Sequence, residues 1–230
     1  MKFNRSFELK NISFKYPNSD IPAIDNLTLK INKFSKVGIT GQSGCGKTTL
    51  INILLGLIEP DKGEIFIDGK ELKKSNKISW LKKVGYVPQE IYISDETVIS
   101  NIAFGIDKKL IDINRVYEVA RIANIDNFIR NELEHGYNTN VGDNGIKLSG
   151  GQKQRIGIAR ALYRKPQVII LDEGTSSLDN ETENEVMKAI YKMSKEITII
   201  LIAHRLNTLD NCDYIYKIEK GKIIQNYKNI

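Results

Sequence analysis

Alternating apolar and polar positions predict strands in the first third of the chain. Residues 7–12 (FELKNI) and 27–31 (LTLKI) alternate apolar with polar side chains, as half-buried strands do. Residues 65–69 (IFIDG) predict a further strand that ends in a turn. Strands with one polar face are typical of antiparallel sheets. We therefore expect an antiparallel β subdomain in this region.

Continuous apolar runs predict buried strands in the last third of the chain. Residues 168–171 (VIIL) and 197–203 (ITIILIA) have no polar face that could meet solvent. Two helices are predicted beside them, at residues 151–164 and 180–195. Buried strands that alternate with helices indicate a parallel sheet covered on both faces, so the fold class is α/β.

Between these parts the pattern changes to that of helices. Four apolar residues fall on one helical face, namely Ile113, Val116, Val119 and Ala120. Asp112 stands where an N-cap is needed. We predict a helical subdomain at approximately residues 90–145, inserted into a core that comprises residues 1–89 and 146–230.

Composition and charge narrow the choice of function only slightly. The chain has 230 residues, is 41% hydrophobic and 27% charged, and carries a net charge of +6, which suits an anionic ligand or partner. No apolar run approaches the roughly 18 residues of a membrane span, and residues 1–6 lack the apolar core of a signal peptide. We expect an intracellular chain that does not cross a membrane itself. Two cysteines are too few for a disulfide framework or a four-cysteine zinc site.

A glycine-rich stretch fits the phosphate-binding pattern G-x-x-x-x-G-K-[ST] in full. Its residues are Gly41, Gln42, Ser43, Gly44, Cys45, Gly46, Lys47 and Thr48, with Thr49 directly after them. A predicted buried strand at residues 36–40 precedes it, and a predicted helix at residues 49–55 follows. Glycines let successive backbone N–H groups point at an anion, and the helix adds its own unpaired N–H groups. The plainer alternative, an ordinary glycine turn before a helix, leaves the filled pattern unexplained.

The same pattern predicts what the loop binds. In such a loop the lysine, here Lys47, reaches the β- and γ-phosphates of a nucleotide, and the hydroxyl of Thr48 binds Mg²⁺. We therefore expect ATP and Mg²⁺ as cofactors.

Two carboxylates, Asp172 and Glu173, end the buried strand that starts at residue 168. Buried carboxylates need a cation or hydrogen bonds to remain charged. In a phosphate-loop protein the first acid of such a strand holds Mg²⁺, and the second can act as general base on the attacking water. The alternative is a pair of carboxylates that cap the next turn.

A second anion-binding helix start is predicted at Leu148, Ser149, Gly150, Gly151 and Gln152. One nucleotide does not need two phosphate cradles. The economical explanation is that the second cradle serves the ATP held by another copy of the chain. Two copies would then form a head-to-tail homodimer with twofold symmetry around two nucleotides.

In this order the motifs resemble those of the nucleotide-binding domain of ATP-binding-cassette (ABC) transporters. Residues 41–49 match the Walker A loop, residues 148–152 the signature and residues 168–172 the Walker B strand. The resemblance covers nearly the whole chain. It implies a P-loop NTPase (RecA-like) core with a parallel sheet, so that residues 1–230 form one ATP-hydrolysing domain.

The resemblance also implies roles for single residues. Tyr16 would stack on adenine, Gln89 would contact Mg²⁺ and the attacking water, and His204 would contact the γ-phosphate. Glu173 would be the catalytic carboxylate, and Asp179 belongs to the D-loop that crosses the dimer interface. Taken alone, Tyr16 could be a surface aromatic, Gln89 a loop residue and His204 a hydrogen-bonded core histidine.

Further stretches are similar to the exporters within this family. Residues 136–145 (GYNTNVGDNG) resemble the exporter pattern G-Y-x-T-x-V-G-E-x-G, and residues 97–102 resemble the exporter stretch after the Q-loop. Residues 80–92 are similar to lipid-linked oligosaccharide flippases and other lipid exporters. Asp143 stands where exporters usually have Glu, which affects a contact with the membrane partner. Gly174 replaces the usual Ala and could loosen the turn after Glu173.

The exporter resemblance implies a motor that moves a transmembrane domain and lies on the cytoplasmic face of the membrane. That domain would be encoded separately or fused to this chain, and we favour a fused exporter of which this chain is a fragment. One alternative is an ABC ATPase that acts on nucleic acid or ribosomes. It would need a long coiled coil or a second cassette, so we expect no nucleic-acid partner. The other, a binding module without turnover, is disfavoured because Glu173 and His204 are both present.

Overall fold

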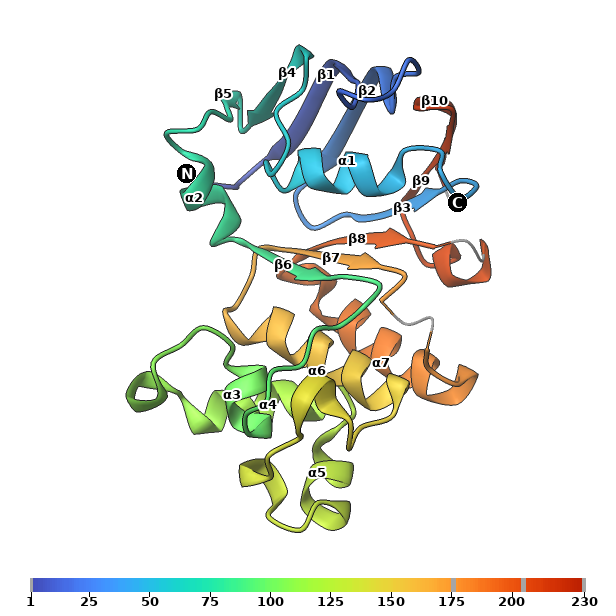
Figure 1. Ribbon diagram of the computed structural model, residues 1–230. Helices are drawn as coiled ribbons and strands as arrows, with labels where there is room; N and C mark the ends of the chain where they lie inside the picture. Colours follow the sequence, from blue (N-terminus) through green and yellow to red (C-terminus); the bar gives the residue numbers. More distant parts are fainter. Residues whose placement is uncertain (1, 175–176, 204–205, 229–230) are drawn as a thin grey trace. The chain divides into compact units, whose positions relative to one another are not determined.

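The computed structural model describes residues 2–174, 177–203 and 206–228, which form two compact units (Figure 1). The first unit runs to Val84 and resumes at Ser194, and the second comprises Gly85–Met193. Among the described residues, no helix has both the length and the hydrophobicity that a membrane crossing requires.

An antiparallel sheet in the first unit has the order β2-β1-β4-β5. Its strands are β1 (Ser6–Phe14), β2 (Ile24–Asn32), β4 (Lys62–Ile67) and β5 (Lys70–Glu71). In the register of β1 with β2, Phe7 lies opposite Ile31 and Leu9 opposite Leu29. All four of these side chains are buried, because the period-two pattern turns them to one face of the sheet. The antiparallel sheet predicted from that pattern is confirmed.

A second group of strands in the first unit surrounds β3 (Lys36–Thr40). On one side β3 pairs in parallel with β8 (Thr198–Ile202), and on the other with β9 (Tyr214–Glu219). β10 (Lys222–Lys228) continues antiparallel from β9. The parallel pairing predicted from the continuous apolar runs is confirmed for β3 and β8.

The helices of the first unit are short. They are α1 (Lys47–Leu54), α2 (Lys77–Leu81) and the 3-10 helix Leu206–Leu209. α2 carries Trp80, whose ring lies 5.2 Å from that of Phe7 and 5.7 Å from that of Phe3. The indole N–H of Trp80 donates to the Leu54 carbonyl at 2.8 Å, which fastens α2 to the end of α1.

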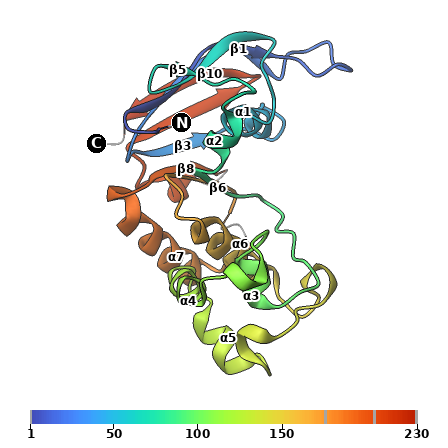
Figure 2. The ribbon, with the colours of Figure 1, turned by 90° about the vertical axis from the view of Figure 1, so that its left-hand side faces the viewer.

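The second unit combines two neighbouring strands, β6 (Val84–Val87) and β7 (Val168–Asp172), with five α-helices among its described residues. The helices are α3 (Val98–Ile102), α4 (Ile113–Ile122), α5 (Asp126–Glu132), α6 (Gly150–Tyr163) and α7 (Asn180–Lys192). Short 3-10 helices cover Lys108–Leu110, Gly136–Asn138 and Asp143–Gly145, and another, Met193–Lys195, begins at the last residue of this unit. α3 and α4 both pack on α6 (Figure 2).

The predicted start of α4 is confirmed in detail. Asp112 caps the helix, because its carboxylate accepts a hydrogen bond from the Arg115 N–H at 3.0 Å. The buried Arg115 guanidinium then donates to the carbonyls of Leu162 at 2.5 Å and Tyr163 at 3.2 Å. These carbonyls lie in the last turn of α6, where the Leu162 carbonyl also accepts from the Lys165 N–H at 3.1 Å, so Arg115 joins the start of α4 to the end of α6.

Candidate nucleotide-binding site

The residues expected to act on a nucleotide fall into two sets, one in each unit. The first unit holds Tyr16 and the glycine-rich loop. The second unit holds Gln89, Asp172, Glu173, Ser149, Gly150, Gly151, Gln152 and Asp179. His204 lies outside the described residues.

The glycine-rich loop connects the end of β3 at Thr40 to the start of α1 at Lys47. Gly44 has φ 76° and Gly46 has φ 109°, conformations that residues with a Cβ adopt only with strain. A Cβ on Gly46 would also lie 2.4 Å from the Ala23 carbonyl oxygen. The loop thus needs glycine at position 46 both for its backbone angle and for its close approach to the chain before β2.

The loop has the properties of a phosphate cradle. Within the described residues, the backbone N–H groups of Gly44, Gly46, Lys47 and Thr48 donate to no protein acceptor. They stand at the start of α1, where the helix dipole adds positive potential. Adjacent unpaired donors at a helix start are what an anionic phosphate requires, so the residues present fit a nucleotide phosphate.

Lys47 and Thr48 differ in their surroundings. Lys47 is 8% exposed, and its ammonium donates to the carbonyls of Gly41 at 2.8 Å and Gln42 at 3.0 Å. Its positive charge is therefore held beside the loop. The side chain of Thr48 is exposed. Cys45 is buried, and its carbonyl accepts a hydrogen bond from the Gly221 N–H at 2.9 Å, so this residue fixes the loop to the turn before β10.

Tyr16 lies beside the residue that follows the loop motif. Its hydroxyl is 3.1 Å from Oγ1 of the buried Thr49. The ring packs edge-on against Phe14 at 4.9 Å and is 41% exposed. An aromatic ring held in this way keeps exposed surface on which a base can stack.

In the second unit, β7 carries Asp172 to its carboxyl end. All five residues of β7 are buried, and Asp172 is 9% exposed. The hydroxyl of Tyr86 on β6 donates to Asp172 Oδ2 at 3.3 Å. Burial, together with the Asp172 charge, raises the pKa of Tyr86, so this tyrosine remains a neutral donor. Carboxylate and hydroxyl oxygens such as those of Asp172 and Thr48 are the donor types that Mg²⁺ prefers.

Glu173 directly follows β7 and has φ 50°, a left-handed conformation that is unusual for a residue with a Cβ. Its carboxylate accepts a hydrogen bond from Gln89 Nε2 at 3.1 Å. The structure therefore brings together two residues that are 84 positions apart in the sequence. The main-chain carbonyl oxygen of Glu173 accepts a second hydrogen bond, from Gln154 Nε2 at 3.0 Å.

Sequence reasoning did not identify Tyr86 or Gln154. Gln154 stands two positions after Gln152, the last residue of the signature, and this closeness to the signature is the sequence signal that could have pointed to it. The partner of Tyr86 is 86 positions away in the sequence. Contacts of this kind depend on how strands and helices pack, which local patterns do not encode.

The signature stretch forms the start of α6. Ser149 Oγ accepts from the Gln152 N–H at 3.3 Å, and Gln152 Oε1 accepts from the Ser149 N–H at 2.7 Å. This capping box defines the helix start. Among the described residues, the N–H groups of Gly150 and Gly151 have no protein acceptor. Two free N–H groups at a helix start fit a second anion site.

Asp179 caps α7 by accepting a hydrogen bond from the Thr182 N–H at 2.9 Å. This bond lowers the pKa of the Asp179 carboxyl, as expected for a carboxylate at a helix start. Asp179 thus has a local structural role whether or not it also meets a second copy of the chain.

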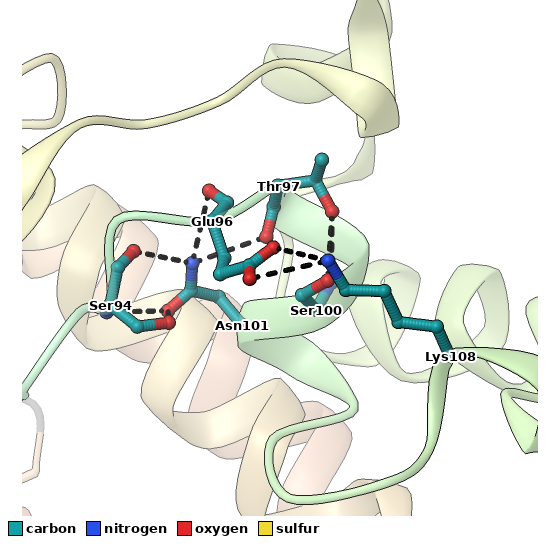
Figure 3. Close-up of polar contacts among 6 residues, drawn as sticks. All are labelled: Ser94, Glu96, Thr97, Ser100, Asn101 and Lys108. Carbon is teal, nitrogen blue, oxygen red and sulfur yellow. Dashed lines mark hydrogen bonds and ion pairs between the residues drawn. The ribbon is translucent and has the colours of Figure 1, made fainter.

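The stretch between Gln89 and α3 is fastened to α6 by Asn101 and Arg160. The fully buried Asn101 amide donates to the carbonyls of Ser94 at 3.0 Å and Thr97 at 3.1 Å (Figure 3). Arg160 on α6 donates to the carbonyls of Tyr92 at 2.7 Å and Asn101 at 2.8 Å. Burial lowers the pKa of Arg160 to about 10, so its guanidinium remains charged at neutral pH.

Comparison with known proteins identifies a family. A family model described as "ABC transporter" matches residues 24–176. The chain is 45% identical over 222 residues to an export ATP-binding/permease protein of Rickettsia typhi, covering 95% of this chain and 38% of that protein. It is 43% identical over 218 residues to an ATP-dependent lipid A-core flippase of Wigglesworthia glossinidia brevipalpis, covering 95% of this chain and 37% of that protein.

A solved structure agrees with these relatives. A bacterial Atm1-family ABC exporter with ATP bound matches with a TM-score of 0.93 and 34% identity, covering all of this chain and 40% of that chain. The chain thus spans about two-fifths of the length of each of these three proteins. The similarities are to exporters, and the alternative of a nucleic-acid or ribosome ATPase is not favoured.

Proposed function

Because this chain belongs to the ABC transporter family, we propose that it is the ATP-binding and ATP-hydrolysing motor domain of an exporter. The observation that carries the proposal is the glycine-rich loop. There, the N–H groups of Gly44, Gly46, Lys47 and Thr48, which have no acceptor among the described residues, accompany the buried Lys47 ammonium. This arrangement supports the binding of a nucleoside triphosphate through its phosphates. The relatives support ATP in particular, since the matching exporter structure is described with ATP bound.

In the proposed reaction each residue of the chain has a limited task. Lys47 neutralises the β- and γ-phosphates, Thr48 and Asp172 offer oxygen ligands to Mg²⁺, and Tyr16 stacks on the base. When bound, Mg²⁺ would supply charge neutralisation of the phosphate oxygens.

The hydrolytic step is proposed to depend on Glu173. The Glu173 carboxylate orients or deprotonates the attacking water. Gln89 holds this carboxylate in place by donating a hydrogen bond to it at 3.1 Å. His204, which lies outside the described residues, would contact the γ-phosphate. Charge that develops on the transferred phosphoryl group would then be stabilised by Lys47 and His204.

The signature is proposed to complete the site of a second copy. The N–H groups of Gly150 and Gly151 have no acceptor in the described part of the chain, and Ser149 is exposed. Both observations support contact with a phosphate held by another copy. A head-to-tail homodimer would place each signature over the ATP of the partner copy, with Asp179 near the interface. ATP binding would favour the closed dimer, and hydrolysis would release it.

We infer that the motor acts on a transmembrane domain. The relatives include export ATP-binding/permease proteins, and this chain matches about two-fifths of their length. A permease domain, fused or separate, would hold the motor at the cytoplasmic face of the membrane. The transported molecule would be selected by that domain.

The proposal is tested with the variant Glu173→Gln. We expect the parent chain to hydrolyse ATP in the presence of Mg²⁺. Glu173→Gln should lose turnover by about a hundredfold to ten-thousandfold, as removal of a general base typically does. In ATP the variant should migrate as a dimer in size-exclusion chromatography with light scattering. The matched control is Glu134→Gln, because the Glu134 side chain is 86% exposed and its loss should leave both properties unchanged.

Two outcomes would contradict the proposal. The assignment of the base fails if Glu173→Gln hydrolyses ATP near the parental rate. The dimer fails if the variant remains a monomer in ATP at high protein concentration.

A further inference from the structure

We propose that Gln154 is a positioning residue for hydrolysis, which holds the main chain of Glu173 in the conformation that aims its carboxylate. The inference rests on the proposed function, because it takes Glu173 as the residue that orients or deprotonates water. It assigns to Gln154 no contact with the nucleotide.

The backbone of Glu173 requires support. With φ 50°, the residue adopts a left-handed conformation directly after the buried strand β7. Residues with a Cβ occupy this region at an energetic cost, and they persist there only when the surrounding structure holds them. The turn matters for the site, since it directs Glu173 Oε2 toward Gln89 Nε2 at 3.1 Å.

Gln154 supplies that support with both ends of its amide. Its side chain is 1% exposed. Nε2 donates to the Glu173 carbonyl at 3.0 Å, and Oε1 accepts from the Ser177 N–H at 2.9 Å. One buried side chain therefore joins the backbone at Glu173 to the backbone at Ser177, because both of these hydrogen bonds end on main-chain atoms.

The residue type follows from this geometry. A glutamate would lack the donor when ionised, a methionine would lack both polar atoms, and an asparagine would be one methylene shorter. Burying an amide is unfavourable unless its donor and its acceptor are both satisfied. Here the donor is satisfied by the Glu173 carbonyl and the acceptor by the Ser177 N–H.

Two glycines of α6 also pack closely against residues near Glu173 and Gln89. A Cβ on Gly151 would lie 3.2 Å from the Ser177 carbonyl oxygen, so the helix approaches Ser177 closely there too. A Cβ on Gly157 would lie 2.5 Å from Ile91, two residues after Gln89. Positions 151 and 154 are neighbours on the helix surface, and so are positions 154 and 157, because each pair is three residues apart. α6, which begins with the signature, thus supports the Glu173 backbone and packs closely on Ile91.

The first test is the steady-state rate of ATP hydrolysis by Gln154→Met in the 230-residue chain. Methionine keeps the volume and loses both hydrogen bonds. We expect kcat to fall by about 10- to 100-fold with KM for ATP changed by less than about twofold, because the base is misplaced while the phosphate loop is untouched. The matched control is Ile158→Val, which loosens the buried core of the same helix and should leave kcat unchanged.

The second test is the pH dependence of Gln154→Glu. An ionised carboxylate cannot donate to the Glu173 carbonyl, whereas the protonated form can. Burial and the nearby Glu173 charge should raise the pKa of the new carboxyl well above about 4.3. The ratio of kcat in this variant to kcat in the parent should therefore rise as the pH falls from about 8 to about 6. The same ratio for Gln154→Met should stay flat.

The outcomes separate the inference from the proposed function. If Glu173→Gln abolishes turnover while Gln154→Met keeps kcat within about twofold of the parent, the inference alone is overturned. A flat pH ratio for Gln154→Glu likewise overturns the donor role, and this ratio decides the matter if Gln154→Met does not fold. If Glu173→Gln retains turnover, the failure lies with the proposed function.

Discussion

Replacing Gly46 with alanine should destabilise the first unit far more than the same change at Gly44. Both glycines lie in the phosphate-binding loop and both have positive φ, 109° and 76°. A Cβ on Gly46 would lie 2.4 Å from the Ala23 carbonyl oxygen and 3.1 Å from Ile24 Cδ1, whereas a Cβ on Gly44 would meet no atom of the described residues within 4 Å. Comparing the two variants therefore separates the cost of backbone strain from the cost of a steric clash.

The magnitude follows from these two terms. An unfavourable backbone conformation costs about 1–3 kcal/mol at either position. The collision at Gly46 adds about 1–3 kcal/mol, because a backbone carbonyl has to move to admit the methyl group. We expect Gly44→Ala to lower the free energy of unfolding by about 1–3 kcal/mol and Gly46→Ala by about 2–6 kcal/mol. The larger loss is a substantial part of the roughly 5–15 kcal/mol that stabilises a typical domain.

Trp80 provides the assay. It is the single tryptophan of the sequence, and it packs on Phe3 and Phe7 in the same unit as the loop. Its fluorescence in a urea titration therefore reports unfolding of that unit, and the midpoint and slope give the free energy of unfolding. Equal destabilisation by the two variants, within about 0.5 kcal/mol, would refute the close approach of Gly46 to Ala23.

Three further changes test other contacts. Tyr16→Ala should weaken ATP binding by about tenfold through lost stacking while kcat at saturating ATP stays near the parental value; a large fall in kcat would contradict a stacking role. Asp68→Asn should lower the free energy of unfolding by about 1–2 kcal/mol at pH 7, because the Asp68 carboxylate accepts hydrogen bonds from three N–H groups at residues 4–6. Burial alone would raise the pKa of the Asp68 carboxyl, but the three hydrogen bonds outweigh burial and leave it below its ordinary 3.8. The difference in unfolding free energy between parent and variant should therefore shrink as the pH falls below 3.8; a difference independent of pH would contradict this role of Asp68. Arg115→Met should cost about 2–3 kcal/mol in a urea titration followed by circular dichroism, since it leaves the buried Leu162 carbonyl without its charged donor; an unchanged midpoint would show that this bond contributes no stability.

Much of the fold could be predicted from short-range patterns. Period-two alternation identified β1 and β2, and the apolar face together with Asp112 identified α4 and its first residue. Continuous apolar runs identified β7 and β8. The helices α2 and α3 were not predicted. Each has five residues, which is too short for a helical period to be recognised.

The site was predictable to the extent that its chemistry lies in consecutive residues. The glycine loop, the signature and the acids after β7 each form a local motif, because a turn or a helix start can be specified by its own few residues. Their roles in ATP hydrolysis remain predictions, which the variants of Glu173 and Gln154 will test.

The sequence by itself determined the family, the order of the motifs and most strands and helices, because these depend on neighbouring residues and on the period of the apolar positions. Only the tertiary structure decided that Gly46 lies against Ala23, that Tyr86 donates to Asp172, and that Gln154 holds the backbone of Glu173. Such contacts join residues from different elements. They depend on close packing and on the need of every buried polar group for a hydrogen-bond partner. Neither requirement produces a periodic pattern in the sequence.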